Sequence, residues 1–465
     1  MSPAMRPLYR EGYRTVRDIV GPLLFVEGVR NAGYGETVTV ESPQGIATGQ
    51  ILLVEEGYCA IQVFEGTMGL DAPRSTVYLE RDIVRVPVGK MLMGRILDGR
   101  FRPLDGKPAP LGGELMSIQG EPLNPTRRIG PDKFVETGIS TIDLMNTLVR
   151  GQKLPIFSGA GLPAARIAAQ IATQARVPGS EQSFLVIFAA MGVTQQEARY
   201  FMDVFSEAGV LAHGVFFLNL ASDSPVERLL TPRMALAVAE YFAFTLEYDV
   251  LVVLTDMLQY CEALREISAA REEMPGRRGF PGYMYSDLST LYERAGSVKG
   301  KSGSITQIPI ITMPDDDMTH PVVDLSGYIT EGQIVLSRDM NERGLFPPVS
   351  VLPSLSRLMN KGIGRGKTFP EHRALADQLY ASSAKGKELE RLKLIVGEEG
   401  LSPVEQNYLS FAKRFEERFV HQGQEDRPLD SSMRIGMECL SLLPRDELYR
   451  LPEEYLQRMT EGKVT

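Results

Sequence analysis

Apolar runs that alternate with helical stretches dominate the middle of this 465-residue sequence, from Phe134 to about Pro348. The runs are LPIFSG, FLVIFAAM, VFFLNL, VLVVLTDM and ITQIPIIT, and a typical stretch between them is PVERLLTPRMALAVAEYFAFTLE. Strands that are apolar on both faces and joined by helices are typical of a mostly parallel, doubly wound sheet, because the helices cover both faces. We therefore predict a large central α/β domain.

The two flanks of this region have different patterns. From Val20 to about Val84, short β-rich runs separated by Gly, Asn, Asp and Pro predict a small closed β-barrel. From about Ser354 to Thr465, amphipathic helical patterns with polar breaks predict a helical domain. We place the domains at 1–84, 85–353 and 354–465, with a connector rich in Gly and Pro at the start of the second. The predicted fold class is multidomain α/β.

Composition excludes several classes of function. The formal net charge of -9 argues against a nucleic-acid partner, because affinity for polyanions comes from clustered Lys and Arg. The three cysteines lack C-x-x-C spacing, so we expect neither a disulfide framework nor structural zinc, and a reducing cytosol fits. The four histidines are scattered, and we assign no metal site. The sequence contains no leader pattern and no apolar run of about 18 residues, so we expect no direct membrane insertion.

The first strand of the central domain leads into IFSGAGLPAARIAAQ, where a phosphate-binding loop would lie between strand and helix. The working pattern G-x-x-x-x-G-K-[ST] needs a second Gly, a Lys and a hydroxyl. Counted from Gly159, those positions hold Ala164, Ala165 and Arg166. Gly159, Gly161 and Arg166 are therefore candidates for weak nucleotide binding in a degenerate loop. A plain strand-to-helix turn without nucleotide explains the segment equally well.

Two other segments imitate ligand sites. GIGRGKT, residues 362–368, ends in Gly-Lys-Thr, but it is one residue too short and follows a predicted helix, so we interpret it as a surface loop. The acidic cluster Asp315, Asp316 and Asp317 lacks the spacing of an EF-hand and a closing Glu, so we expect a solvated turn.

Asp256 ends the run VLVVLTD, at the edge where a parallel sheet presents a carboxylate to magnesium. Asp is also a common helix cap, and a helix is predicted to begin around Gln259. The sequence leaves these two roles open.

Arg357 lies in VLPSLSRLMN, near the junction of two predicted domains. Most single Arg residues in loops are solvated or pair with a surface carboxylate. At a junction, the guanidinium could instead reach across an interface to phosphates on a neighbour, because its planar fork of donors matches phosphate oxygens.

Several long segments, in order along essentially the whole chain, resemble the B subunit of V/A-type rotary ATPases. They are VETGISTIDLMNTLVRGQKLPIFSGAGLP, TDMLQYCEALREISAAREEMPGRRGFPGYMY, LYERAG, SITQIPIITMPDDDMTHPVVDLSGYITEGQI and LPSLSRLMN. The resemblance implies an N-terminal β-barrel, a central P-loop-NTPase-like α/β domain and a C-terminal helical bundle. It also implies a ring in which three such subunits alternate with three catalytic A subunits, contacts with central shaft and peripheral stalk subunits, and a cytoplasmic location peripheral to the membrane.

The resemblance further implies how ATP is bound. In this family the catalytic subunit supplies an intact phosphate loop and an acidic base, the latter in G-E-R-G-N-E. The corresponding segment here is GVTQQE, residues 192–197, so Val193 stands where the Glu would be. Arg357 matches the arginine finger that acts in trans on the neighbour's ATP, and Asp256 matches the strand-end carboxylate. We expect ATP or ADP with Mg at the interface with the catalytic subunit, and none firmly bound by this chain alone.

We therefore predict a non-catalytic subunit that completes an ATP site in trans and couples ATP hydrolysis or synthesis to rotation and to proton or sodium transport. One alternative is a self-sufficient rotary-type or secretion-type NTPase, but such enzymes keep G-x-x-x-x-G-K-[ST]. The other is a purely structural ring spacer. It would tolerate the loss of Arg357 without loss of hydrolysis.

Overall fold

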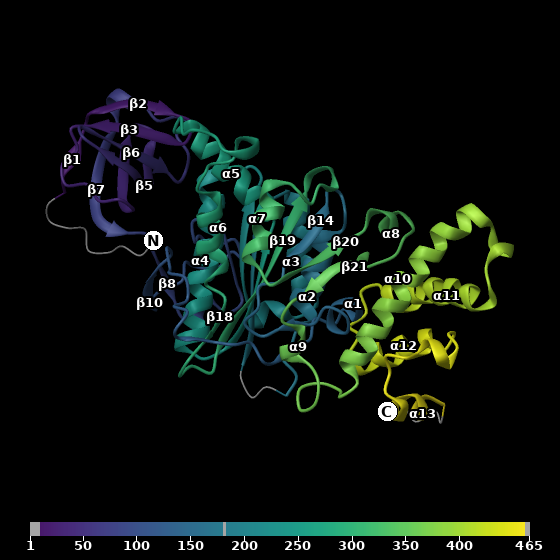
Figure 1. Ribbon diagram of the computed structural model, residues 1–465. Helices are drawn as coiled ribbons and strands as arrows, with labels where there is room; N and C mark the ends of the chain where they lie inside the picture. Colours follow the sequence, from purple (N-terminus) through teal and green to yellow (C-terminus); the bar gives the residue numbers. More distant parts are fainter. Residues whose placement is uncertain (1–9, 180–182, 461–465) are drawn as a thin grey trace. The chain divides into compact units, whose positions relative to one another are not determined.

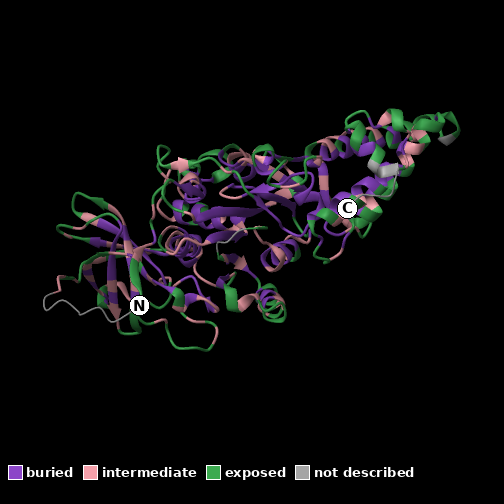
Figure 2. Cartoon of the chain, turned by 90° about the horizontal axis from the view of Figure 1, so that it is seen from below, coloured by how far each residue is buried: buried purple, intermediate pink, exposed green. Residues whose placement is uncertain are grey.

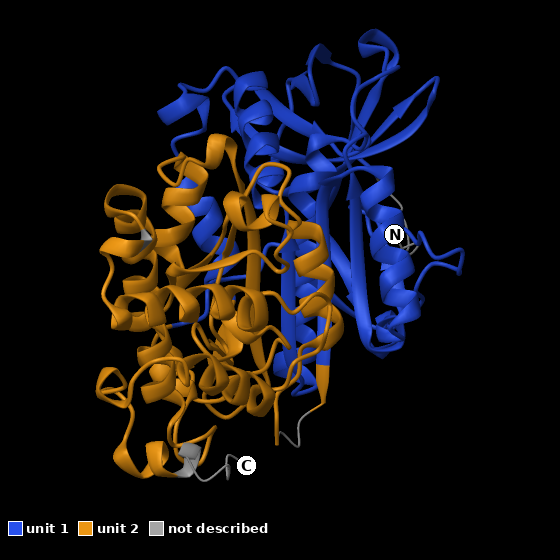
Figure 3. Ribbon diagram, turned by 90° about the vertical axis from the view of Figure 1, so that its right-hand side faces the viewer, with its two compact units in different colours: residues 1–124, 185–294 blue, residues 125–184, 295–465 orange. Residues whose placement is uncertain are grey.

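The computed structural model describes residues 10–179 and 183–460 (Figure 1). The chain forms two compact units, which Figure 3 shows in different colours. Unit 1 consists of residues 1–124 and 185–294, and unit 2 of residues 125–184 and 295–465. Each unit contains part of the predicted central α/β domain, and the domain boundaries drawn from the sequence stay predictions.

The N-terminal part of unit 1 is an antiparallel sheet of seven strands. In spatial order the strands are β1 (Gly12–Tyr13), β7 (Thr76–Ile83), β4 (Glu36–Ser42), β5 (Gly45–Glu55), β6 (Tyr58–Val63), β3 (Leu23–Glu27) and β2 (Val16–Val20). Because side chains alternate between the two faces of a strand, the sheet has one apolar face. Its core includes Leu24, Val26, Val38, Ile61 and Val77. The strands begin at Gly12, before the β-rich pattern that starts at Val20.

The rest of unit 1 contains an α/β layer. Its strands are β17 (Asp249–Thr255), β15 (Phe184–Val193), β16 (Gly214–Leu220) and β9 (Arg95–Leu97), in that spatial order. The pairs β15–β16 and β16–β9 are parallel. The helices are α3 (Gln195–Glu207), α4 (Pro225–Glu240), α5 (Met257–Ala270) and α6 (Met284–Tyr292), and β8 (Arg85–Val88) pairs with β10 (Glu114–Ser117). Every residue of β17 is buried, as its continuous apolar run predicted.

Unit 2 has its own set of sheet strands. In spatial order they are β21 (Val349–Ser356), β20 (Gly332–Leu336), β14 (Ile156–Gly159) and β19 (Ser304–Met313). Strand β14 is parallel to both β19 and β20, whereas β21 is antiparallel to β20. The helices of this part are α1 (Ser140–Asp143), α2 (Ala164–Gln174), α7 (Pro321–Ile329), α8 (Arg338–Glu342) and α9 (Met359–Gly362). Short strands add two pairings: β12 (Phe134–Val135) with β13 (Leu148–Val149), and β11 (Arg128–Ile129) with β18 (Gly296–Val298).

Helices form the end of unit 2. They are α10 (His372–Val396), α11 (Pro403–Arg414), α12 (Leu429–Leu440) and α13 (Glu453–Thr460), with a π-helical turn at Phe415–Val420. Their shared core includes Leu375, Leu379, Phe411, Phe419 and Leu440. In Figure 2 the central strands, such as β14, β17 and β19, are almost wholly buried, while the outer faces of these helices are exposed. The sequence pattern therefore predicted the three kinds of structure correctly.

Residues 10–179 and 183–460 contain neither a helix suited to cross a membrane nor a cluster of metal ligands. No helix there is both long and apolar enough to cross a membrane. No group of three or more His, Cys, Asp or Glu side chains there could hold a metal ion.

Candidate functional site

The segment that would bind phosphate is a tight turn between β14 and α2. Gly159 is the last residue of the strand, and its carbonyl accepts a hydrogen bond from the Leu162 amide at 3.1 Å. Gly161 has a φ of +79°, a conformation that favours glycine. Helix α2 begins at Ala164 and has no side-chain cap. The structure thus confirms that this loop lies between a strand and a helix, where a phosphate loop would be.

An ion pair from elsewhere in unit 2 lies directly against this loop. Arg338 donates from Nε to Asp316 Oδ2 at 2.7 Å and from Nη2 to Asp316 Oδ1 at 2.8 Å. Its Nη2 also donates to the Ala160 carbonyl at 2.9 Å, and a Cβ on Gly159 would lie 1.9 Å from Asp316 Oδ1. The guanidinium lowers the pKa of the Asp316 carboxyl. The acidic cluster is therefore not just a solvated turn, because one of its members braces the loop.

Arg166 occupies the position at which the working pattern has a hydroxyl. Its guanidinium carbon lies 4.2 Å from the centre of the Phe346 ring, which is cation–π geometry. The residue is exposed. Ala164 and Ala165 offer neither the second glycine nor the lysine, so the chemistry of a complete phosphate loop is missing.

Asp256, in unit 1, caps a helix. Its carboxylate accepts a hydrogen bond from the Leu258 amide at 2.8 Å, and α5 begins at Met257. The helix thus starts two residues before Gln259, where the sequence analysis had placed its beginning, because Asp256 itself is the cap. The capping role is the one that the geometry supports.

Val193 ends β15, and its side chain is buried. The nearby acidic residue, Glu197, belongs to a capping box at the start of α3. It accepts from the Thr194 amide at 2.9 Å, and its own amide donates to Thr194 Oγ1 at 3.1 Å. This carboxylate has a structural task at the helix end, and Val193 cannot act as a base.

Arg357 follows β21, the edge strand of the sheet in unit 2. It is exposed, and its Nη1 donates to the Thr330 carbonyl at 3.3 Å. Among the described residues, no carboxylate lies within ion-pairing distance of its guanidinium. The edge of the sheet therefore presents a positive charge that the described residues leave without an ion pair.

Sequence reasoning missed the polar residues beneath Arg357. Gln152, Lys153 and Glu331 form a buried or partly buried group that contacts the end of β21. The signal was a Gln-Lys pair next to the apolar run LPIF, because polar side chains beside a buried strand need partners within the protein.

The segment 362–368 is a loop after α9, as predicted. The Thr368 hydroxyl accepts from the Gly364 amide at 2.9 Å and lies 3.1 Å from Nδ1 of His372. Lys367 donates to the Lys361 carbonyl. The Gly-Lys-Thr groups are therefore bonded within the loop.

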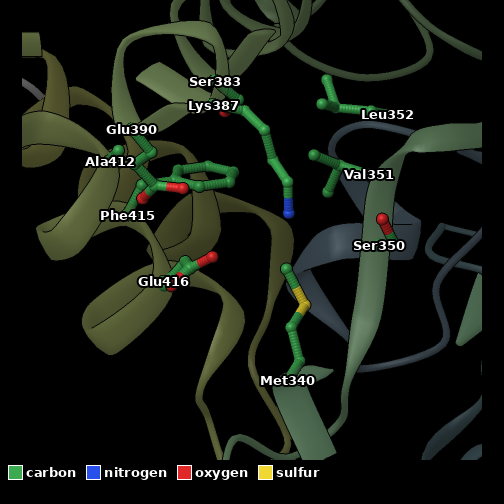
Figure 4. Close-up of a pocket in the computed structure, with 10 residues that line it drawn as sticks. All are labelled: Met340, Ser350, Val351, Leu352, Ser383, Lys387, Glu390, Ala412, Phe415 and Glu416. Atoms are coloured by element: carbon green, nitrogen blue, oxygen red, sulfur yellow. The ribbon is translucent and has the colours of Figure 1, made fainter. Parts of the chain in front are cut away.

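A small cavity lies between β21 and the C-terminal helices (Figure 4). In the close-up, the Lys387 amine extends between Val351 and Met340. The cavity volume is about 40 Å³, which is far below the volume of a nucleotide site. Neither Arg357 nor the loop after β14 lines it, so this cavity is not the functional site.

Comparisons with known proteins cover almost the entire chain. Residues 138–356 match the nucleotide-binding domain of the ATP synthase alpha/beta family, and residues 16–79 match the beta-barrel domain of that family. Residues 361–460 match the C-terminal domain of V and A type ATP synthase. These matches confirm the predicted fold class of barrel, α/β domain and helical domain.

Individual proteins are similar over the same length. The V-type ATP synthase beta chains of two strains of Thermus thermophilus are 53% identical over 465 residues, which is 98% of this chain and 97% of theirs. A solved structure of an ATP synthase subunit, NeqB from Nanoarcheaum equitans, aligns with a TM-score of 0.73 and 37% identity. The alignment covers 91% of this chain and all of that one.

Proposed function

The chain belongs to the ATP synthase alpha/beta family, among the V-type beta chains, and from this premise we propose that it is the non-catalytic B-type subunit of a rotary ATPase. In this proposal it lends Arg357 to an ATP site that a neighbouring catalytic A subunit mainly builds. The observation that carries the proposal is the exposed, unneutralised guanidinium at the end of β21.

The chain's own residues do not fit a self-sufficient nucleotide site. A lysine for the phosphates and a hydroxyl for magnesium are replaced by Ala165 and Arg166, and Arg166 stacks on Phe346. Val193 stands in place of a base. Asp256 caps α5 through the Leu258 amide, and we assign it no magnesium role. We therefore propose ATP or ADP with Mg only at the interface with the catalytic subunit.

Arg357 has the right chemistry for a role in trans. During phosphoryl transfer, negative charge is spread over the oxygens of the moving phosphoryl group, and a guanidinium offers several donors in one plane to such oxygens. A lysine carries the same charge but lacks this planar arrangement of donors. Strand β20 lies between β21, which Arg357 follows, and β14, which leads into the loop at Gly159. The Arg357 side chain is exposed, so a packed neighbour could reach its donors.

The wider assembly follows from the family. We propose a ring of three such subunits and three catalytic A subunits, in contact with central shaft and peripheral stalk subunits and held at the cytoplasmic side of a membrane by other parts of the complex. The complex would couple ATP hydrolysis or synthesis to rotation and to proton or sodium transport. No nucleic acid takes part.

The test compares ATP hydrolysis by the purified chain, by its mixture with the catalytic subunit, and by the same mixture with Arg357→Ala. Ring assembly is measured by native mass for each sample. We expect activity only in the wild-type mixture, with Arg357→Ala rings assembled but slower on the order of 10³- to 10⁵-fold. Robust turnover by the isolated chain would indicate a self-sufficient NTPase. An active Arg357→Ala ring would indicate a structural spacer.

A further inference from the structure

We propose that Gln152 and Lys153 are positioning residues for Arg357, and that Lys153 also keeps the Glu331 carboxylate from neutralising it. This inference rests on the proposed role of Arg357 in trans. Its starting point is the peptide at Glu331, whose carbonyl accepts hydrogen bonds from the Arg357 amide and from Gln152 Nε2, each at 3.0 Å.

Gln152 holds the end of β21 from below. It is fully buried, and its Nε2 also donates to Ser356 Oγ at 3.0 Å. Its Oε1 accepts from the Val149 amide at 2.9 Å, while Ser356 Oγ donates to the Thr147 carbonyl at 2.8 Å. Both amide hydrogens of Gln152 and its oxygen are thus engaged, so its orientation is fixed. Gln152 therefore contacts Ser356, the residue before Arg357, directly. It is linked to the Arg357 amide through the Glu331 carbonyl, which both groups contact.

Lys153 and Glu331 are joined by backbone and side chain together. The Glu331 amide donates to the Lys153 carbonyl at 3.0 Å, and the Lys153 amide donates to Glu331 Oε2 at 2.8 Å. Lys153 Nζ lies 2.7 Å from Glu331 Oε1, and the Lys153 side chain is only 2% exposed. Both carboxylate oxygens of Glu331 therefore have partners inside unit 2.

This pairing matters because Glu331 carries a carboxylate and is bonded to Arg357 through the backbone. Its own carbonyl touches the Arg357 amide, and the preceding carbonyl, of Thr330, accepts from the guanidinium. If Lys153 did not hold the carboxylate, Glu331 could turn toward Arg357 and form an ion pair with it. Such a pair would neutralise the charge that the neighbour's phosphates require.

The backbone at this point is also closely packed. Gly332 has a φ of +137°, and a Cβ there would lie 2.1 Å from the Leu355 carbonyl oxygen. Gly332 pairs with Ser356 across the two strands. The end of β21 is therefore held by strand pairing, by Gln152 and by the Glu331 peptide, which leaves little freedom for the backbone of Arg357. Placement of this kind is what a charge acting in trans needs, because a shift of about 1 Å can cost roughly 100-fold in rate.

The experiment uses rings reconstituted with the catalytic subunit and compares kcat and KM for ATP. We expect Gln152→Ala to lower kcat by about 10- to 100-fold with KM nearly unchanged. Gln378→Ala is the matched control, because Gln378 is equally buried and bonds to Ser382 and Glu447 among the C-terminal helices. It should leave kcat unchanged. An assembled Gln152→Ala ring with wild-type kcat would overturn the positioning role.

A separate experiment tests whether Lys153 keeps the Glu331 carboxylate from neutralising Arg357. We expect Lys153→Met to lower kcat, and Lys153→Met with Glu331→Gln to recover most of the loss, because the amide cannot neutralise Arg357. A double variant as slow as Lys153→Met would overturn this part. If Gln152→Ala prevents ring assembly, Ser356→Ala removes a single hydroxyl from the same network and decides: a several-fold lower kcat supports the role, and an unchanged kcat overturns it.

Failure of the inference and failure of the proposed function give different results. If Arg357→Ala rings hydrolyse ATP normally, the proposed function is wrong. If Arg357→Ala rings are inactive while Gln152→Ala and Ser356→Ala rings are normal, the proposed function stands and the positioning role is wrong.

Discussion

The loop after β14 and the end of β21 lie in one unit but treat their arginines in opposite ways. At the loop, Arg338 is paired with Asp316 and bonded to the Ala160 carbonyl, and Arg166 is stacked on Phe346. At the end of β21, the Glu331 carboxylate is paired with Lys153, and the Arg357 guanidinium stays exposed without an ion pair to the described residues. The proposed function makes use of this difference, because in it the chain lacks a complete nucleotide site of its own and contributes Arg357 to the site of a neighbour.

A positively charged side chain near a phosphate loop does not by itself indicate phosphate binding. A positive side chain near a degenerate phosphate loop suggests phosphate binding when only the sequence is seen. In the structure, the arginines near that loop have partners within the chain. Arg357, which forms no ion pair with the described residues, follows an edge strand of the sheet, where the sequence alone could not distinguish a solvated side chain from a finger.

The largest expected effect comes from replacing the planar guanidinium at position 357 by an ammonium group. We expect Arg357→Lys rings to remain at least about tenfold slower than wild type, because lysine is a point charge and lacks the planar fork of donors. Steady-state hydrolysis by rings of equal assembly measures this, with Arg365→Ala in the exposed loop after α9 as the control. A lysine ring as fast as wild type would mean that the sheet edge supplies only charge.

The second prediction concerns the pH dependence of stability. It involves His372, which contacts Thr368 in the loop 362–368, the segment whose sequence resembles a phosphate loop. His372 is fully buried, and burial lowers its pKa to about 4, whereas an unfolded histidine has a pKa near 6.5. Protons therefore bind the unfolded chain more tightly, so the free energy of unfolding should fall as pH drops from about 6.5 to 4. The total loss should be about 3 kcal/mol.

The measurement is thermal or denaturant unfolding of the purified chain across that pH range. His372→Gln should flatten the pH dependence, whereas His213→Gln, at an exposed position, should not. If the His372→Gln chain keeps the full wild-type slope, the histidine does not carry it.

A third and smaller effect concerns how tightly the loop after β14 is braced. Gly159→Ala would place a Cβ 1.9 Å from Asp316 Oδ1, so we expect a loss of about 1–3 kcal/mol in the free energy of unfolding. Gly161→Ala meets no atom within 4 Å and should cost only about 1 kcal/mol, for its left-handed backbone. Unfolding curves of the two variants decide the matter. Equal losses would show that the ion pair yields and does not brace the loop.

The smallest expected effect is on turnover by a repaired loop. The triple variant Ala164→Gly, Ala165→Lys and Arg166→Thr restores the pattern that binds phosphates and magnesium. We still expect no ATP turnover by the isolated chain, because Val193 cannot serve as a base and Arg357 belongs to a neighbour's site. Hydrolysis by this variant alone would contradict this expectation, because the loop residues would then be all that the isolated chain lacks for turnover.

The sequence predicted the layers of the fold well because burial on both faces leaves a direct trace. The continuous apolar run of β17 has that trace, and so does the buried strand β14, which ends at Gly159. The helix after Asp256 was predicted to begin around Gln259, and α5 begins two residues earlier, at Met257. Of the two roles that the sequence left open for Asp256, the contacts show the helix cap.

The contacts that define the site could not be predicted in the same way. Asp316 and Arg338 are 22 residues apart, and Gln152 and Glu331 are 179 residues apart. Neither pair has a local pattern, because each forms only when separate strands and helices pack. The degenerate loop was visible as missing residues, whereas the ion pair that occupies its flank was not.

The most direct test compares single-turnover ATP hydrolysis by two assembled rings, one with Arg357→Ala and one with Arg166→Ala. The account predicts that the Arg357→Ala ring binds ATP but hydrolyses it on the order of 10³-fold or more slowly, while the Arg166→Ala ring matches wild type. The opposite order, with the Arg166→Ala ring inactive and the Arg357→Ala ring unaffected, would contradict it and assign the chemistry to the loop after β14.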